Sequence, residues 1–195
     1  MRNGKQVDAA MGLSRTGHLV LSTIHANDAV SQIDRLQDMG ITLAQLAEKN
    51  LLRLLTAQRL LPLLCHHCKV PLSDEDFSDW KLFASSASYQ KLLDYRNKIF
   101  KQHHKGCKHC SMTGVSSRHL VLEYIVVDED GRKFIRNGDM QGWVRHLREN
   151  NWESMADHSW KLILEGRVDP NVADGIVPDL IVDSSLPYKY GDVDV

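Results

Sequence analysis

Four cysteines are the residues of this chain whose type and spacing best predict chemistry. They form two Cys-x-x-Cys pairs, Cys65 with Cys68 and Cys107 with Cys110, and the chain has no other cysteine. Each pair presents two thiolates from one tight turn, and two such turns complete a tetrahedral Zn²⁺ site with bonds of about 2.3 Å. We therefore predict one zinc ion per chain. Its role should be structural, because four thiolates leave no open coordination position for a reacting water. Redox-active dithiols or disulfides are the alternative.

The two cysteine pairs are separated by residues 69–106, a longer gap than a zinc ribbon usually has. An insertion with its own structure must therefore lie between them. An acidic segment opens this insertion, and two short amphipathic helices are predicted near residues 75–84 and 87–99.

Histidines and lysines gather around the cysteine pairs. His103 and His104 lie in the basic run 98–108 (KIFKQHHKGCK). This run predicts either a solvated basic face or a contact with an acidic partner or lipid head groups. Three more histidines lie inside the two turns, and we expect them to face solvent or to donate hydrogen bonds near the metal rather than to bind it: His66, His67 and His109.

A second segment with chemical interest follows the N-terminal residues. Residues 18–24 (HLVLSTI) predict a strand covered on both faces, because nearly all of them are apolar. Ser22, Thr23 and His25 lie at its carboxyl end, the edge where ligands bind in open α/β sheets. A histidine there could hydrogen-bond a phosphate or a water. The simpler alternative is that His25 only satisfies a loop and His18 only begins a strand.

The remaining hydrophobic pattern predicts further helices and one more strand. The longest helix is predicted over 42–61, where leucines recur at helical spacing before Pro62. The segment 176–195 reads as a loose tail. Other helices are predicted at 6–15, from Asn27 or Asp28 to about Met39, and at 130–137, 139–149 and 155–166, with a second strand at 119–127.

Composition excludes some classes of function. The formal net charge is −1, whereas a dedicated nucleic-acid binder carries a basic excess. No window holds the roughly 20 apolar residues that a membrane span requires. The first residues lack an apolar signal core, so paired cysteines favour reduced, metal-bound thiols in the cytoplasm.

Several motifs, in order, resemble one known family. Residues 16–29 (TGHLVLSTIHANDA) resemble the histidine box of the ATPases that drive type II secretion, type IV pilus extension and conjugative thin pili. Residues 35–40 (RLQDMG) resemble the helix after that box. The remaining matches resemble the tetracysteine zinc element and the strand after it: AQRL at 57–60, LCHHC at 64–68, CKHCSMTG at 107–114, then Arg118 and Glu123. The similarity runs from about residue 5 to 175.

Two departures from the family pattern point to a divergent, thin-pilus-like branch. Ser117 precedes Arg118, where the family usually has glycine, and the following strand is plainer than the family's turn into a strand. These departures leave the particular secretion or pilus system open.

The resemblance implies an α/β fold in which this chain is the C-terminal portion of a larger protein. It implies the end of a RecA-like P-loop ATPase domain followed by a mostly α-helical zinc-binding region. The implied divisions are 1–62 for the ATPase core with its histidine box, 63–118 for the zinc element and its helical insertion, 119–175 for a C-terminal strand and helices, and 176–195 for the tail.

The resemblance also implies roles for individual residues. His25 would face the γ-phosphate, and His18 would begin the same strand, so that both couple nucleotide state to subunit movement. Thr23 lies in the same box. Arg35 and Arg59 could reach a neighbouring subunit's nucleotide, with a surface ion pair as the alternative for each.

The family's phosphate-binding loop, GxxxxGK[ST], does not occur in these 195 residues, and the Gly4-Lys5 pair is followed by glutamine. ATP and Mg²⁺ are therefore expected only in the full-length protein, and this chain alone should not hydrolyse ATP. The implied partners are further copies in a hexamer and an inner-membrane platform protein, at the cytoplasmic face of the inner membrane, without nucleic acid. The alternative is a stand-alone zinc-binding module that contacts protein or nucleic acid.

Overall fold

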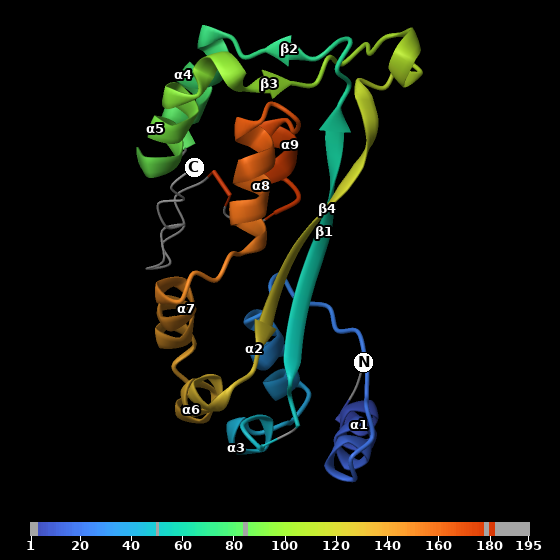
Figure 1. Ribbon diagram of the computed structural model, residues 1–195, viewed down its shortest axis with the longest axis vertical. Coiled ribbons are helices and arrows are strands. Elements are labelled where there is room, and N and C mark those ends of the chain that lie inside the picture. Colours follow the sequence, from blue (N-terminus) through green and yellow to red (C-terminus); the bar gives the residue numbers. More distant parts are fainter. Residues whose placement is uncertain (1–3, 50, 84–85, 178–179, 182–195) are drawn as a thin grey trace. The chain divides into compact units, whose positions relative to one another are not determined.

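The computed structural model describes residues 4–49, 51–83, 86–177 and 180–181, and it mixes helices with strands, as the α/β prediction requires (Figure 1). The chain divides into two compact units. The first comprises Met1–Ala57 and Glu123–Trp152, and the second comprises Gln58–Leu122 and Glu153–Val195. Both units use part of β1 (Leu54–Leu64) and β4 (Val115–Val126), which pair as a two-stranded antiparallel sheet.

The first unit is built from helices around one end of this sheet. Helix α3 packs against α6, and Arg136 of α6 donates to the carbonyl of Ala47 at 3.5 Å. Ile33, Ile135 and Trp143 are at most 1% exposed and form its core. Its helices are α1 (Gly4–Arg15), α2 (Ser31–Asp38), α3 (Leu43–Leu46), α6 (Glu129–Asn137) and α7 (Met140–Glu149).

The second unit contains the predicted insertion between the cysteine pairs. The strands β2 (Val70–Pro71) and β3 (Phe100–Lys101) pair antiparallel at its base. Between them lie α4 (Asp74–Phe83), α5 (Ser86–Asp94) and the 3₁₀ turn η1 (Arg96–Lys98). The two predicted helices of the insertion are thus confirmed. The unit also holds the 3₁₀ turn η2 (Lys108–Cys110), α8 (Met155–Leu164) and α9 (Pro170–Asp174).

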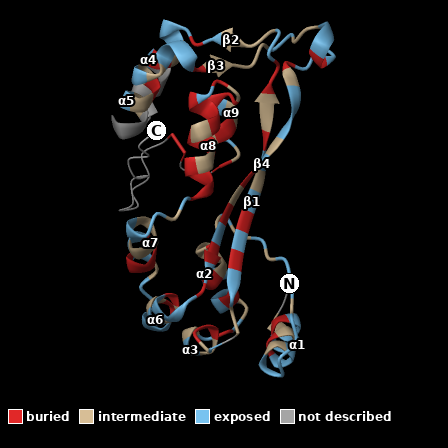
Figure 2. Ribbon diagram, in the orientation of Figure 1, coloured by how far each residue is buried: buried red, intermediate tan, exposed pale blue. Residues whose placement is uncertain are grey.

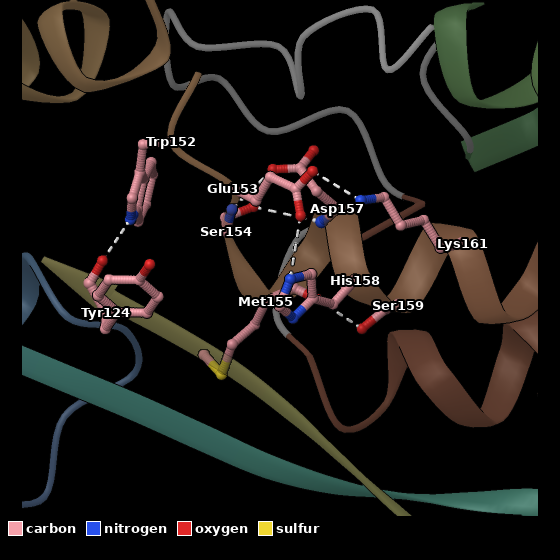
Figure 3. A network of polar contacts seen from close by, with 9 residues as sticks. All are labelled: Tyr124, Trp152, Glu153, Ser154, Met155, Asp157, His158, Ser159 and Lys161. Atoms are coloured by element: carbon pink, nitrogen blue, oxygen red, sulfur yellow. Dashed lines mark hydrogen bonds and ion pairs between the residues drawn. The ribbon is translucent and has the colours of Figure 1, made fainter. Parts of the chain in front are cut away.

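Helix α8 begins at a buried capping box, drawn in Figure 3. The backbone N–H and the hydroxyl of Ser154 donate to Asp157 Oδ2 at 2.7 and 2.8 Å, and the Asp157 N–H donates back to the Ser154 hydroxyl at 3.3 Å. Beside it, Glu153 accepts from Lys161 Nζ at 2.6 Å and lies 3.1 Å from His158 Nε2. These contacts fix where the helix starts, close to the predicted position.

The predicted helix over 42–61 is wrong. Only α3 is helical there, with Thr42 and Gln45 forming its capping box, and β1 follows from Leu54. Buried and exposed residues alternate along β1, as Figure 2 shows, and Leu55, Ala57 and Leu61 face inward. The leucines of this region fit a helical period as well as a strand period, and pairing with the distant β4 decides between them.

The predicted strand over 18–24 is also wrong for this structure. The segment has no regular secondary structure, and Leu19 and Leu21 are 85% and 86% exposed. A strand exists only where a neighbour completes its ladder of hydrogen bonds. The sheets of the described residues pair β1 with β4 and β2 with β3, and neither includes this segment.

The remaining element predictions agree with the structure to within a few residues, and the strand predicted at 119–127 is the second half of the longer β4. Two residues of the segment predicted as a tail are packed in the structure. Leu180 and Ile181 are buried, and the Ile181 N–H donates to Asp174 Oδ1 at 2.8 Å. Residues 182–195 of that tail lie outside the described residues.

Among the helices that the structure describes, none has the length and apolar character of a membrane span.

Candidate metal centre

The four cysteine sulfurs lie together in the second unit. All four Sγ atoms are within 4.8 Å of one another. Three sulfur pairs are 3.8 Å apart: Cys65 with Cys107, Cys68 with Cys110, and Cys107 with Cys110. A tetrahedron with Zn–S bonds of about 2.3 Å has sulfur–sulfur edges of about 3.8 Å, whereas a disulfide bond is about 2.05 Å long. The spacing fits a zinc ion and does not fit disulfides.

The first cysteine pair is positioned by the end of β1. The Cys65 N–H donates to the Gly114 carbonyl at 3.0 Å, which joins the first turn to the second. The N–H groups of Cys68 and Lys69 both donate to the Cys65 carbonyl, at 3.3 and 2.9 Å. This tight turn directs both thiols to the same side.

The second pair brackets η2, with Cys107 immediately before it and Cys110 as its last residue. Ser111 and Met112 have φ of 50° and 64°, which carries the chain back beside Gly106. A Cβ on Gly106 would lie 2.3 Å from the Met112 carbonyl carbon, so the two backbones approach as only glycine permits. The Met112 N–H then closes the loop on the Cys107 carbonyl at 2.9 Å.

Hydrogen bonds make the Cys110 thiol more acidic than an ordinary cysteine. Cys110 Sγ accepts from the N–H groups of Cys107 and Gly114, each at 3.1 Å. Burial would raise the pKa of Cys110, but these donors outweigh it and lower that pKa to about 6. At Cys68, burial and the neighbouring thiols raise the pKa to about 12. Four thiolates at this spacing therefore require a cation to offset their mutual repulsion.

The histidines near the cysteines lie outside this group of ligand atoms. Within the part of the chain that the structure describes, the group holds four sulfurs and no imidazole nitrogen. His67 and His109 stack on each other at the surface, with ring centroids 3.9 Å apart and an interplanar angle of 18°. The stack joins the two turns from outside, and His66 is exposed beside it.

The residues predicted at the histidine box lie in the first unit, away from regular structure. His18, Thr23 and His25 are all exposed on the segment between α1 and α2. His18 Nδ1 lies 3.0 Å from the hydroxyl of Thr16. Their predicted roles toward a nucleotide stay predictions.

The two predicted arginines lie on separate elements. Arg35 is exposed on α2, in the first unit, and forms an ion pair with Asp38 at 3.5 Å. Arg59 is half-buried on β1, in the second unit, and donates to the Gln58 carbonyl at 2.9 Å. For Arg35 the surface ion pair considered as the alternative is present, and the role of either arginine toward a nucleotide stays a prediction.

Glu123 is a structural residue whose role the sequence did not specify. It lies on β4, is 2% exposed, and its Oε1 accepts from the Ala29 N–H at 2.5 Å. This bond ties the end of the histidine segment to β4 within the first unit. The signal in the sequence is a single carboxylate inside an otherwise apolar strand, HLVLEYIVV.

Comparison with known proteins decides the family. The family model described as Type II/IV secretion system protein matches residues 1–176. The chain belongs to this family. The predicted membership is thereby confirmed, and a stand-alone zinc module is not favoured.

Named relatives cover both branches of the family. Type II secretion system protein E of Dickeya dadantii is 35% identical over 143 residues, which is 72% of this chain and 26% of the relative. Type II secretion system ATPase E of Vibrio cholerae is 36% identical over 149 residues, 76% of this chain and 27% of the relative. Type IV pilus assembly ATPase PilB of Thermus thermophilus is 33% identical over 167 residues, 85% of this chain and 18% of the relative. The chain thus spans about a quarter of the length of these relatives or less.

Proposed function

We propose that this chain is the C-terminal portion of a hexameric motor ATPase that powers type II secretion or the assembly of a type IV or conjugative pilus. One observation carries the proposal. The chain that matches the family over residues 1–176 also brings Cys65, Cys68, Cys107 and Cys110 to zinc-binding spacing. The comparisons support both branches of the family and do not choose between them.

In this proposal the first unit supplies the end of a RecA-like sheet. Residues 1–62 belong to the ATPase core, 63–118 to the zinc element and 119–175 to the C-terminal strand and helices, and the segment 176–195 follows them. The exposed apolar side chains of Leu19 and Leu21 support a place for this segment in a larger sheet. Burial of these two side chains would remove apolar surface from water, which is favourable. Neighbouring strands of a larger sheet would provide that burial.

The zinc ion is structural in this proposal. Four sulfurs complete its coordination, and the ion holds the end of β1 against the turn that precedes β4. ATP and Mg²⁺ bind only in the full-length protein. There, His25, His18 and Thr23 respond to the γ-phosphate, while Arg35 and Arg59 reach a neighbouring subunit's nucleotide. The motor works at the cytoplasmic face of the inner membrane against a platform protein.

A chimera tests the proposal directly. The segment of the Vibrio cholerae relative that matches this chain is replaced by residues 1–176, and the chimera is expressed in a strain that lacks its own secretion ATPase. We expect zinc binding, ATP hydrolysis and partial recovery of secretion. His25→Ala in the chimera should abolish hydrolysis, whereas Lys49→Ala, an exposed change in the same unit, should not.

The chain alone provides the complementary measurement. It should bind zinc yet show no ATP turnover above a blank, because no phosphate-binding loop lies within it. A folded, zinc-loaded chimera without hydrolysis would refute the proposed function. So would turnover by the isolated chain that disappears in the His25→Ala variant.

A further inference from the structure

Glu123 places a carboxylate inside the otherwise apolar core of the first unit. It lies on β4 and is 2% exposed, and Ile125, the next residue on the same face of the strand, is 1% exposed. A buried charge lowers stability unless hydrogen bonds compensate for it, and an apolar residue of similar volume often serves a core as well or better. The carboxylate at this position is therefore best explained by the particular group that it binds.

The group that it binds is a backbone amide just before α2. Glu123 Oε1 accepts from the N–H of Ala29 at 2.5 Å, Ala29 is fully buried, and both residues belong to the first unit. Ala29 directly follows residues 18–28, which we call the histidine segment. A charged acceptor forms shorter and stronger hydrogen bonds than a neutral one, and the low dielectric of a buried site strengthens them further. Glu123 thus fixes the chain at the end of the histidine segment.

The turn around Ala29 carries this constraint to its neighbours. The Ser31 N–H donates to Asp28 Oδ1 at 2.7 Å, and the Asp28 N–H donates to the Ser31 hydroxyl at 3.1 Å. Gln32 Nε2 then donates to the carbonyl of Thr56 on β1 at 2.8 Å. Hydrogen bonds to β4 and to β1 therefore hold the start of α2, and all of these residues lie in the first unit.

The histidine segment depends on this anchor for its placement. Residues 18–26 have no regular secondary structure. Before the segment, Arg15 at the end of α1 pairs with Glu48 at 2.7 Å, but the two side chains are 44% and 39% exposed, so solvent weakens the pair. His25 lies nearer along the chain to the buried bond than to this ion pair. The bond to Glu123 therefore constrains the backbone of His25 more than the exposed pair does.

We propose that Glu123 is a positioning residue for His25, which it places by fixing the backbone just after the histidine segment. The inference rests on the proposed function, in which His25 responds to the γ-phosphate of ATP in the full-length protein. A displacement of about 1 Å at a reacting centre can lower a rate by about a hundredfold. Glu123 itself touches neither the nucleotide nor a reacting atom in this proposal, and it acts through the chain that carries His25.

The secretion chimera tests this role through the kinetics of ATP hydrolysis. Glu123→Ala should lower kcat by between about tenfold and about a hundredfold. KM for ATP should change little, because this chain contains no phosphate-binding loop. Glu123→Gln keeps an acceptor oxygen for the Ala29 N–H and should recover most of the lost kcat. The melting temperature of each variant shows that it is folded at the temperature of the assay.

The matched control is Asp128→Ala, which removes a carboxylate-to-backbone hydrogen bond elsewhere in the first unit. Asp128 caps α6, where its Oδ1 accepts from the Gly131 N–H at 2.8 Å. This variant should lose stability yet keep the kcat of the unmodified chimera. Equal losses of kcat in the Glu123→Ala and Asp128→Ala variants would overturn the proposal, because lower stability would then explain both. Full kcat in the Glu123→Ala variant would overturn it as well.

Amide hydrogen exchange on the isolated chain, measured by NMR, separates this proposal from the proposed function. Glu123→Ala should speed exchange of the Ala29 amide, whereas Asp128→Ala should speed exchange at the start of α6 and leave Ala29 protected. Unchanged exchange at Ala29 in the Glu123→Ala variant would overturn the positioning role whatever the chimera does. An unmodified chimera that is folded but does not hydrolyse ATP would instead refute the proposed function.

Discussion

At the scale of single residues, Cys110 is the most sensitive point of the metal centre. Two backbone N–H groups at 3.1 Å favour its thiolate and lower its pKa to about 6, so the metal-binding form of this residue is present at neutral pH. We expect the purified chain to hold one zinc ion. Cys110→Ser should lose most of it during dialysis, because a serine hydroxyl stays protonated at neutral pH. Elemental analysis per chain gives the measurement.

The control for this change is His66→Ala, in the same surface but outside the sulfur group. It should keep a full equivalent of zinc. If His66→Ala lost the metal while Cys110→Ser kept it, the ligand set proposed here would be wrong. Structural zinc contributes on the order of 10 kcal/mol to such folds, so loss of the metal should also lower the melting temperature.

Glu123 is the second residue whose role can be measured. Its carboxylate is buried and accepts from the Ala29 N–H at 2.5 Å. Glu123→Ala would leave that donor buried without an acceptor, and we expect the free energy of unfolding to fall by about 1–3 kcal/mol. Glu123→Gln retains an acceptor oxygen and should cost less. Urea denaturation compares the two, and equal stability of the alanine variant and the unmodified chain would contradict the expectation.

At the scale of elements, the segment 18–24 should change its structure when the rest of the ATPase core is present. In this chain it has no strand neighbour among the described residues, so its amides should exchange with solvent rapidly. In the secretion chimera the same amides should be protected by a hydrogen-bonded ladder. Hydrogen exchange read by mass spectrometry on both proteins makes the comparison. Amides of α8, which is well packed in this chain, serve as the internal reference.

The elements also show which parts of the structure the sequence could predict. Local signals were sufficient for α8, whose Ser154-x-x-Asp157 cap lies in the sequence itself, and for the four cysteines, whose spacing encodes two turns. Local signals failed for β1, because its leucines fit both the helical period and the strand period and its partner β4 lies far along the chain. They failed again at 18–24, where the apolar pattern predicts a strand inside a sheet. None of the described strands pairs with this segment. Tertiary pairing, not intrinsic propensity, decided both cases.

At the scale of the whole molecule, the two compact units should respond differently to loss of zinc. The sulfurs lie in the second unit, where they replace part of the apolar core that a small unit needs. Each unit contains a tryptophan that is 1% exposed, Trp143 in the first and Trp160 in the second. Fluorotryptophan labelling introduces four fluorine signals, one for each tryptophan of the chain, and those of Trp143 and Trp160 report on the interiors of the two units.

We expect a chelator to broaden or shift the Trp160 signal while the Trp143 signal keeps its position. The reason is that the free energy of zinc binding stabilises the folded state of the unit that contains the ligands, and all four sulfurs lie in the second unit. Re-adding zinc should restore the first spectrum. Simultaneous collapse of both signals would show instead that the units fold as one cooperative block, and unchanged signals would show that the metal does not hold the second unit together. Trp160→Phe and Trp143→Phe assign the two resonances, since each removes one signal and keeps an aromatic ring, smaller than indole, in the core.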